Sequence, residues 1–194
     1  YGNVDLRTAT VKSVNTVFTR LILDLGVEPT IQLANRLGLS SVSYAPGEDC
    51  ASVALGAKSG SPLDMASAYG VFAARGMRAE PTPVLRVTDR DGNVIIDNTK
   101  PSTTRALKED VADNVTDILQ GVLISGTAGG RGIERPAAGK TGTTQNNRDA
   151  WFIGYTPTLA TAVWMGYENK TVATAKTLGN ITGGSFPARI WQAF

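Results

Sequence analysis

The chain has 194 residues and a formal net charge of +2, with 19 lysines and arginines against 17 aspartates and glutamates. This balance does not favour nucleic-acid binding, and 42% hydrophobic with 19% charged residues indicates a packed domain rather than a disordered chain. Histidine is absent, which excludes Ser-His-Asp and Cys-His catalysis and His-ligated metal sites within this chain. A single cysteine, Cys50, excludes an internal disulfide and a Cys-rich zinc site.

Apolar residues recur every three to four positions from Leu6 to Leu25, and this period predicts one long helix at the start of the chain. A second helix is expected over Pro29–Leu37. The third expected helix, between Ser61 and Gly76, has the clearest boundaries, because Ser61 is suited to cap it, Pro62 to occupy its first turn and Gly76 to end it. Two more helices are expected, over Leu107–Leu123 and from about Pro187 to Phe194.

Strand-like runs follow the third helix. Val84–Thr88 and Val94–Ile96 flank Asp91-Gly92, which is a strong signal for the turn of a hairpin. Three later runs are expected to form one sheet: Ala138–Thr144, Ala150–Tyr155 and Leu159–Tyr167. Helices that precede strands joined by short loops predict an α+β fold, with an antiparallel β-sheet and flanking α-helices.

The beginning of the chain resembles the interior of a longer protein. Tyr1 leads almost directly into the first helix, and no basic segment followed by an apolar one opens the chain as a signal peptide would. The chain contains no run of about 18 apolar residues, so the sequence does not predict a transmembrane helix. We therefore expect residues 1–194 to be a portion of a larger chain.

The sharpest local motif runs from Gly139 to Thr144 and reads Gly-Lys-Thr-Gly-Thr-Thr. A phosphate-binding loop would need a glycine five positions before Gly139 and a helix after the motif. Glu134 occupies that position, and strand-like sequence follows. The nucleotide-binding alternative therefore fails on both spacing and context.

A strand that recognises an anion is the other interpretation of this motif. The lysine supplies charge, the threonine hydroxyls supply donors, and Gly139 and Gly142 leave room for a substrate backbone. Strand side chains alternate, so Lys140 and Gly142 share one face while Thr141 and Thr143 share the other. Both sets reach one cleft only at a bulge or a sheet edge. A solvated lysine on a surface strand is the simpler alternative.

Ser13-Val14-Asn15 lies within the first predicted helix. Serine and asparagine in helices are ordinarily caps or exposed polar residues, so the triplet alone favours no function. Residues two positions apart do not share a helix face. Ser13 and Asn15 would therefore reach one site only if the chain there departs from regular helical geometry.

Aromatic residues gather on the strand-like runs toward the C-terminus. Trp151, Phe152, Trp164 and Tyr167 are expected to pack in the core or between layers rather than to stack on a ligand. Asp149, at the entry to the same run as Trp151, is expected to be a solvated turn residue.

Five segments together resemble a known family: Lys12–Phe18, Ser61–Tyr69, Lys140–Thr144, Asp149–Phe152 and Thr182–Ala188. They are similar to the transpeptidase domain of class A penicillin-binding proteins, the bifunctional peptidoglycan synthases. The similarity extends in order across nearly the whole chain, which makes it far more specific than any single triplet. It implies the penicillin-recognising serine transpeptidase and β-lactamase-like fold.

That family uses the motifs Ser-x-x-Lys, Ser-x-Asn and Lys-Thr-Gly. Ser13-Val14-Asn15 matches the second and Lys140-Thr141-Gly142 the third. The first is absent, because no lysine in the chain has a serine three positions before it. The resemblance thus implies that residues 1–194 are the C-terminal portion of one such domain. The missing N-terminal part would be its partner, and the fragment alone would be inactive.

The resemblance also implies a chemistry, which is acyl transfer from D-Ala-D-Ala stem peptides through an acyl-serine, together with β-lactam binding. In that chemistry Ser13 relays a proton to the leaving amine, Asn15 binds the substrate amide, and Lys140 supplies positive potential. No cofactor, metal or nucleic acid is implied.

Substrate binding is assigned by the same resemblance to the rest of the motif. The hydroxyls of Thr141 and Thr143 would bind the terminal carboxylate, and the Thr143 N–H would form half of an oxyanion hole. Gly142 and Thr144 complete the expected substrate-binding set.

Two other functions stay open from the sequence. The chain could belong to a catalytically silent binding or scaffold module, as the missing Ser-x-x-Lys suggests, or to a D,D-carboxypeptidase or β-lactamase relative, which passes the acyl group to water. The resemblance further implies a membrane anchor and a glycosyltransferase domain upstream, and a location on the outer face of the cytoplasmic membrane.

Overall fold

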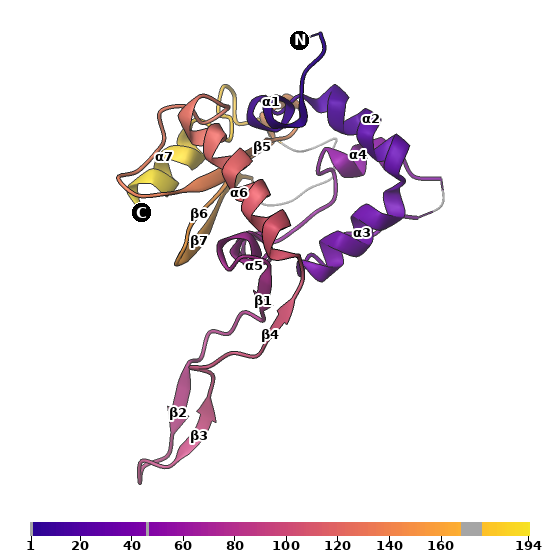
Figure 1. Ribbon diagram of the computed structural model, residues 1–194. Coiled ribbons are helices and arrows are strands. Elements are labelled where there is room, and N and C mark those ends of the chain that lie inside the picture. The colour runs from indigo at the N-terminus through magenta and orange to yellow at the C-terminus, as the bar shows by residue number, and fades with distance from the viewer. Residues whose placement is uncertain (1, 46, 168–175) are drawn as a thin grey trace.

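A computed structural model describes residues 2–45, 47–167 and 176–194 (Figure 1). Its helices are α1 (Leu6–Lys12), α2 (Asn15–Leu25), α3 (Val27–Arg36), α4 (Cys50–Ala54), α5 (Pro62–Ala73), α6 (Glu109–Ile124) and α7 (Phe186–Ala193). Its strands are β1 (Met77–Ala79), β2 (Arg86–Thr88), β3 (Val94–Asp97), β4 (Thr103–Arg105), β5 (Ala138–Thr143), β6 (Asp149–Thr156) and β7 (Leu159–Gly166). The paired strands run antiparallel, so the predicted α+β fold with an antiparallel sheet is confirmed. None of the helices in these ranges is long and apolar enough to cross a bilayer.

The helix expected over residues 6–25 is interrupted, and this part of the prediction is wrong. Ser13 adopts left-handed backbone geometry (φ 54°, ψ 53°) and Val14 is extended, which separates α1 from α2. The Ser13 N–H donates to the Thr10 carbonyl at 3.1 Å and closes α1. Serine side chains compete with helical hydrogen bonds, so the local sequence permits a break that the apolar period conceals.

The expected start of the third helix is confirmed in α5, whereas the helix ends at Ala73, three residues before the glycine that was expected to stop it. The Ser61 hydroxyl accepts a hydrogen bond from the Asp64 N–H at 3.1 Å, and Pro62 is the first helical residue. Gly76 follows the helix with φ 90°, and a Cβ there would lie 2.4 Å from the Leu107 carbonyl oxygen. Glycine is therefore required for both conformation and close packing at this position.

The predicted hairpin is formed by β2 and β3. The Asp89 N–H donates to the Asn93 carbonyl at 2.9 Å, and Gly92 has φ 85° in the turn between them. The hairpin projects away from the body of the protein on β1 and β4, a second strand pair that the sequence pattern did not predict (Figure 1).

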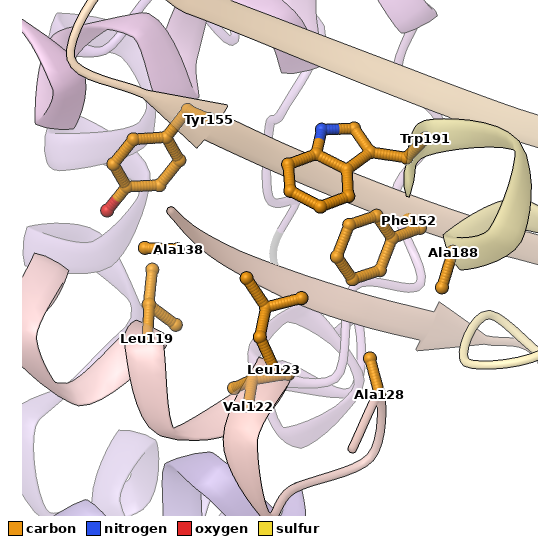
Figure 2. Close-up of a cluster of buried hydrophobic side chains, with 9 residues drawn as sticks. All are labelled: Leu119, Val122, Leu123, Ala128, Ala138, Phe152, Tyr155, Ala188 and Trp191. Carbon is orange, nitrogen blue, oxygen red and sulfur yellow. The ribbon is translucent and has the colours of Figure 1, made fainter. Parts of the chain in front are cut away.

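The main sheet has the order β5-β6-β7, which leaves β5 at an edge within the described part of the chain. Phe152 of β6 is fully buried and packs against Trp191 of α7, with 5.2 Å between ring centroids. A Cβ on Gly154 would lie 2.4 Å from the Trp191 ring, so this glycine lets α7 approach the sheet. Figure 2 shows the same cluster with the side chains that α6 directs toward β5: Leu119, Val122 and Leu123.

The prediction for the aromatic residues is confirmed in one case and wrong in others. Phe152 lies in the core, but Trp164 is 39% exposed and Tyr167 is 53% exposed. Trp164 pairs with Trp151, so it lies on the face of the sheet opposite Phe152, whereas Val163, the partner of Phe152, packs against the core.

Candidate active site

Ser13 and Lys140 are in contact although 127 positions separate them in the sequence. The Lys140 ammonium donates a hydrogen bond to the Ser13 Oγ at 2.9 Å and another to the Thr141 carbonyl oxygen at 2.9 Å. Both side chains are partly buried, where the junction of α1 and α2 meets β5. The structure thus brings together the two motifs that the sequence singled out, while the roles of their residues stay predictions.

The edge position of β5, rather than a bulge, shapes this part of the site. The β5–β6 register runs without a shift from Ala138 opposite Tyr155 to Thr143 opposite Ala150. Gly139 is buried, and a Cβ there would lie 2.6 Å from the Phe152 ring. Gly139 therefore makes room for the core and not for a substrate, which corrects that part of the expectation.

Close packing of α1 on the end of α6 positions Ser13. A Cβ on Gly121 would lie 2.7 Å from the Val11 side chain, and one on Gly126 would lie 2.5 Å from the Val11 carbonyl oxygen. Lys12 also donates a hydrogen bond to the Ser125 carbonyl. These contacts hold the last turn of α1, and hence Ser13, against the segment that follows α6.

The Lys140 ammonium is placed to attract an anion. Burial lowers the pKa of Lys140 to about 8, because desolvation disfavours the charged form. Its two hydrogen-bond partners are neutral oxygen atoms, and no carboxylate of the described residues lies within ion-pair distance of it. An anionic ligand would therefore restore favourable interactions for the charged form.

The motif threonines differ in their partners. The Thr141 hydroxyl lies 2.6 Å from the Thr127 hydroxyl, and the Thr143 hydroxyl accepts a hydrogen bond from the Gly183 N–H at 3.0 Å. A hydroxyl that accepts in this way still has its own proton to donate. Thr143 is exposed, so that proton is available to a ligand.

Thr144 is oriented toward the protein. Its hydroxyl lies 3.2 Å from the Asp149 carboxylate and accepts from the Asp149 N–H at 2.8 Å. Asp149 also accepts a hydrogen bond from the Trp164 indole N–H at 3.0 Å. Asp149 is therefore a structural link between β6, β7 and the end of the motif, and not the solvated turn residue that we expected.

The remaining predicted site residues lie at the borders of the Ser13–Lys140 contact. Asn15 is the exposed first residue of α2, and the break at Ser13 removes the objection that the two cannot face one site. Gly142 is partly buried opposite Trp151, where an added Cβ would lie 3.2 Å from the Trp151 Cβ. A bulkier residue at 142 would thus crowd β6.

Sequence reasoning missed Thr127 and Gly183, which contact the motif threonines. Thr127 lies in a glycine-rich segment, and no local pattern distinguishes a threonine there from an ordinary loop residue. The resemblance included Gly183 only as part of a similar stretch, although a Cβ there would lie 2.2 Å from the Trp151 carbonyl oxygen.

The structure does not support a phosphate-binding loop, and the hollow that it contains beside α7 lies apart from the Ser13–Lys140 contact. β5 leads into a short 3₁₀ turn (Gln145–Asn147) and then β6, not into the helix that a phosphate-binding loop requires. A hollow of about 330 Å³ does exist beside the end of α7, lined by residues that include Glu134, Arg135 and Phe194. It shares no residue with the Ser13–Lys140 contact.

Comparison with known proteins gives a consistent result. Residues 1–186 match the family described as penicillin binding protein transpeptidase domain. Penicillin-binding protein 1A of Aquifex aeolicus is 35% identical over 186 residues, which are 95% of this chain and 24% of that protein. Penicillin-binding protein 1A of Neisseria meningitidis is 34% identical over 198 residues, which are 98% of this chain and 24% of that protein. The chain thus spans about a quarter of the length of these relatives.

Solved structures agree with the sequence relatives. PonA1 of Mycobacterium tuberculosis in complex with penicillin V superposes with a TM-score of 0.86 and 31% identity, over 100% of this chain and 56% of that chain. Penicillin-binding protein 1A of Haemophilus influenzae superposes with a TM-score of 0.84 over 98% of this chain and 34% of that one, and at 23% identity it shows the fold alone. The chain belongs to the penicillin-binding protein transpeptidase domain family, in its class A branch.

Proposed function

We propose that this chain supplies the substrate-binding strand and the proton-relay groups of a peptidoglycan D,D-transpeptidase. The observation that carries the proposal is the hydrogen bond from Lys140 to Ser13 at the edge strand β5. The substrates would be stem peptides that end in D-Ala-D-Ala, and β-lactams would bind in their place. PonA1 of Mycobacterium tuberculosis, which is similar over the whole chain, has been solved with penicillin V.

The charge on Lys140 suits the terminal carboxylate of such a peptide. The ammonium lies beside a strand edge where an extended peptide can pair with the protein backbone. The hydroxyls of Thr141 and Thr143 would donate to the carboxylate, and the Thr143 N–H would donate to the oxyanion. Asn15 would hydrogen-bond the amide of the acyl donor, and Gly142 would let its backbone approach.

The hydrogen bond between Lys140 and Ser13 also has a direction that suits proton transfer. The ammonium donates and the Ser13 oxygen accepts, so the Ser13 hydroxyl proton remains to be given to a third group. When the peptide bond breaks, the leaving D-alanine nitrogen needs one proton. Ser13 would supply that proton and recover one from Lys140, whose lowered pKa makes this return transfer easier.

The nucleophile would come from outside residues 1–194, because the sequence contains no Ser-x-x-Lys. That serine would attack the carbonyl between the two D-alanines, release D-alanine and form an ester. An amine of a neighbouring stem peptide would then attack the ester, form the crosslinking amide and regenerate the serine. In this proposal the chain is the C-terminal portion of the domain, and the whole protein is anchored in the membrane with this domain on its outer face.

The test uses the complete protein and a fluorescent penicillin. We expect covalent labelling that is lost on substitution of the Ser-x-x-Lys serine and strongly slowed in the Ser13→Ala and Lys140→Met variants. Ser102→Ala, at an exposed position between β3 and β4, is the matched control and should label normally. Absence of serine-dependent labelling would overturn the proposal and favour a silent binding module. Crosslinked dimer from purified stem-peptide substrate is the expected product, whereas released D-alanine without dimer would indicate a carboxypeptidase.

A further inference from the structure

Thr127 joins the candidate site from a segment that none of the family motifs includes. It follows α6, and its hydroxyl lies 2.6 Å from that of Thr141. Its side chain is exposed while Thr141 is partly buried, so the pair lies at the surface beside Lys140. A ligand that reaches Thr141 therefore also approaches Thr127.

The backbone of Thr127 is held from two directions. Its N–H donates to the Val11 carbonyl at 3.3 Å, two residues before Ser13. On the other side, a Cβ on Gly184 would lie 2.0 Å from the Thr127 carbonyl oxygen, so the two backbones are packed closely. These contacts fix the backbone of Thr127 relative to α1 and to the segment at Gly184, and so fix the point from which its hydroxyl reaches Thr141.

The hydrogen-bond inventory of the two hydroxyls limits what the pair can do. Each hydroxyl has one proton, and one bond between the oxygens consumes only one of the two protons. If Thr127 donates to Thr141, the Thr141 proton is available to an anion, and the bond it receives makes the Thr141 hydroxyl a better donor. The Lys140 ammonium donates to the Thr141 carbonyl oxygen, so positive charge lies at the backbone of the same residue.

We infer that the Thr127 hydroxyl donates to Thr141 and directs the Thr141 proton toward the carboxylate of the substrate, which makes Thr127 a positioning residue for carboxylate recognition. The inference rests on the proposed function, since it names a further group for the same site. It assigns Thr127 no contact with the reacting atoms. Its effect must therefore require both the Thr141 hydroxyl and a charged carboxylate on the ligand.

The test compares acylation of the complete protein by a penicillin and by the methyl ester of the same penicillin, which has no negative charge. Thr127→Val, which keeps the side-chain shape and removes the hydroxyl, should slow acylation by the free acid about tenfold, as expected for loss of one hydrogen bond in a charged network. Acylation by the ester should change less than about twofold, and Thr127→Ser should restore the rate with the acid. Thr88→Val on the hairpin is the control for the substitution type and should change neither rate.

A double-mutant cycle separates positioning from direct contact. In a Thr141→Val background, Thr127→Val should have no further effect, because the hydroxyl that it positions is gone. Additive losses in the two backgrounds, or equal losses with acid and ester, would overturn the inference. If the unmodified protein is labelled by neither probe, the proposed function itself fails, and that result is distinct from a failure confined to Thr127.

Discussion

Gly126 and Val11 are packed so closely that a Cβ on the glycine would lie 2.5 Å from the Val11 carbonyl oxygen. This contact holds the end of α1, and Ser13 follows two residues later. The same added Cβ would lie 2.6 Å from the Val122 Cα, so backbone surrounds the position on two sides. The candidate site therefore depends on a glycine, a residue that has no side chain with which to bind a ligand.

Replacement of Gly126 by alanine should destabilise the domain by about 1–3 kcal/mol, because backbone atoms must move to accept the methyl group. Gly132→Ala is the matched control, since a Cβ there meets no atom within 4 Å and the residue does not have positive φ. Urea unfolding of the complete transpeptidase domain measures both variants. Equal free energies of unfolding for the two variants would contradict the packing argument.

Replacement of Ser13 by alanine should lower the rate constant of acylation by about 10²- to 10⁴-fold, as expected for loss of a proton donor in the bond-breaking step. Noncovalent affinity for the penicillin should stay within about threefold, because Lys140 and the threonines remain. Stopped-flow measurement of labelling over a range of penicillin concentrations separates the two quantities. A loss confined to affinity would show that Ser13 binds the ligand and does not transfer a proton.

The pH dependence of acylation should report Lys140. The pKa of Lys140 is about 8, so the ammonium is charged below this pH and loses its proton above it. With a penicillin that carries a carboxylate, the second-order rate constant should fall about tenfold per pH unit above that value. In Lys140→Arg the fall should move to higher pH, because arginine stays protonated. If the rate constant falls at the same pH in both proteins, a group other than Lys140 causes the fall.

The same lysine should make stability depend on pH. Its pKa is about 8 in the folded chain, lowered from the ordinary lysine value of 10.5 that the unfolded chain has. Between these values the unfolded chain binds more protons, so the free energy of unfolding must rise with pH. Below about pH 8 the cost of burying the charge is present in full. Above the pKa of Lys140 in the unfolded chain the lysine is neutral in both states, so the free energy of unfolding stops rising with pH.

Lys140→Met removes this contribution and leaves the other titrating groups in place. The difference in free energy of unfolding between the natural protein and the variant should shift in favour of the natural protein from pH 7 to pH 10. Urea unfolding followed by tryptophan fluorescence gives both curves. Parallel pH profiles would mean that the Lys140 charge is well solvated in the folded protein.

Local sequence was sufficient wherever one element carries its own signals. Ser61 and Pro62 begin α5 as expected, and the Asp91-Gly92 turn joins β2 and β3. The runs for β5, β6 and β7 were also placed correctly, because strand-like composition and short connections are properties of neighbouring residues. The break at Ser13 was not predicted, since an apolar period of three to four residues continues on both sides of it.

The sequence alone determined the fold class, the family resemblance and the two motifs that contain Ser13 and Lys140. Only the tertiary structure decided that these two side chains touch, that Thr127 meets Thr141, and that Asp149 binds the Trp164 indole N–H. The reason is physical: caps, turns and periodicity act within a few residues, whereas these contacts depend on how closely α1, α6 and the sheet pack. Glycines at 121, 126 and 184 allow these close contacts, and nothing beside them in the chain shows which distant residue will pack against them.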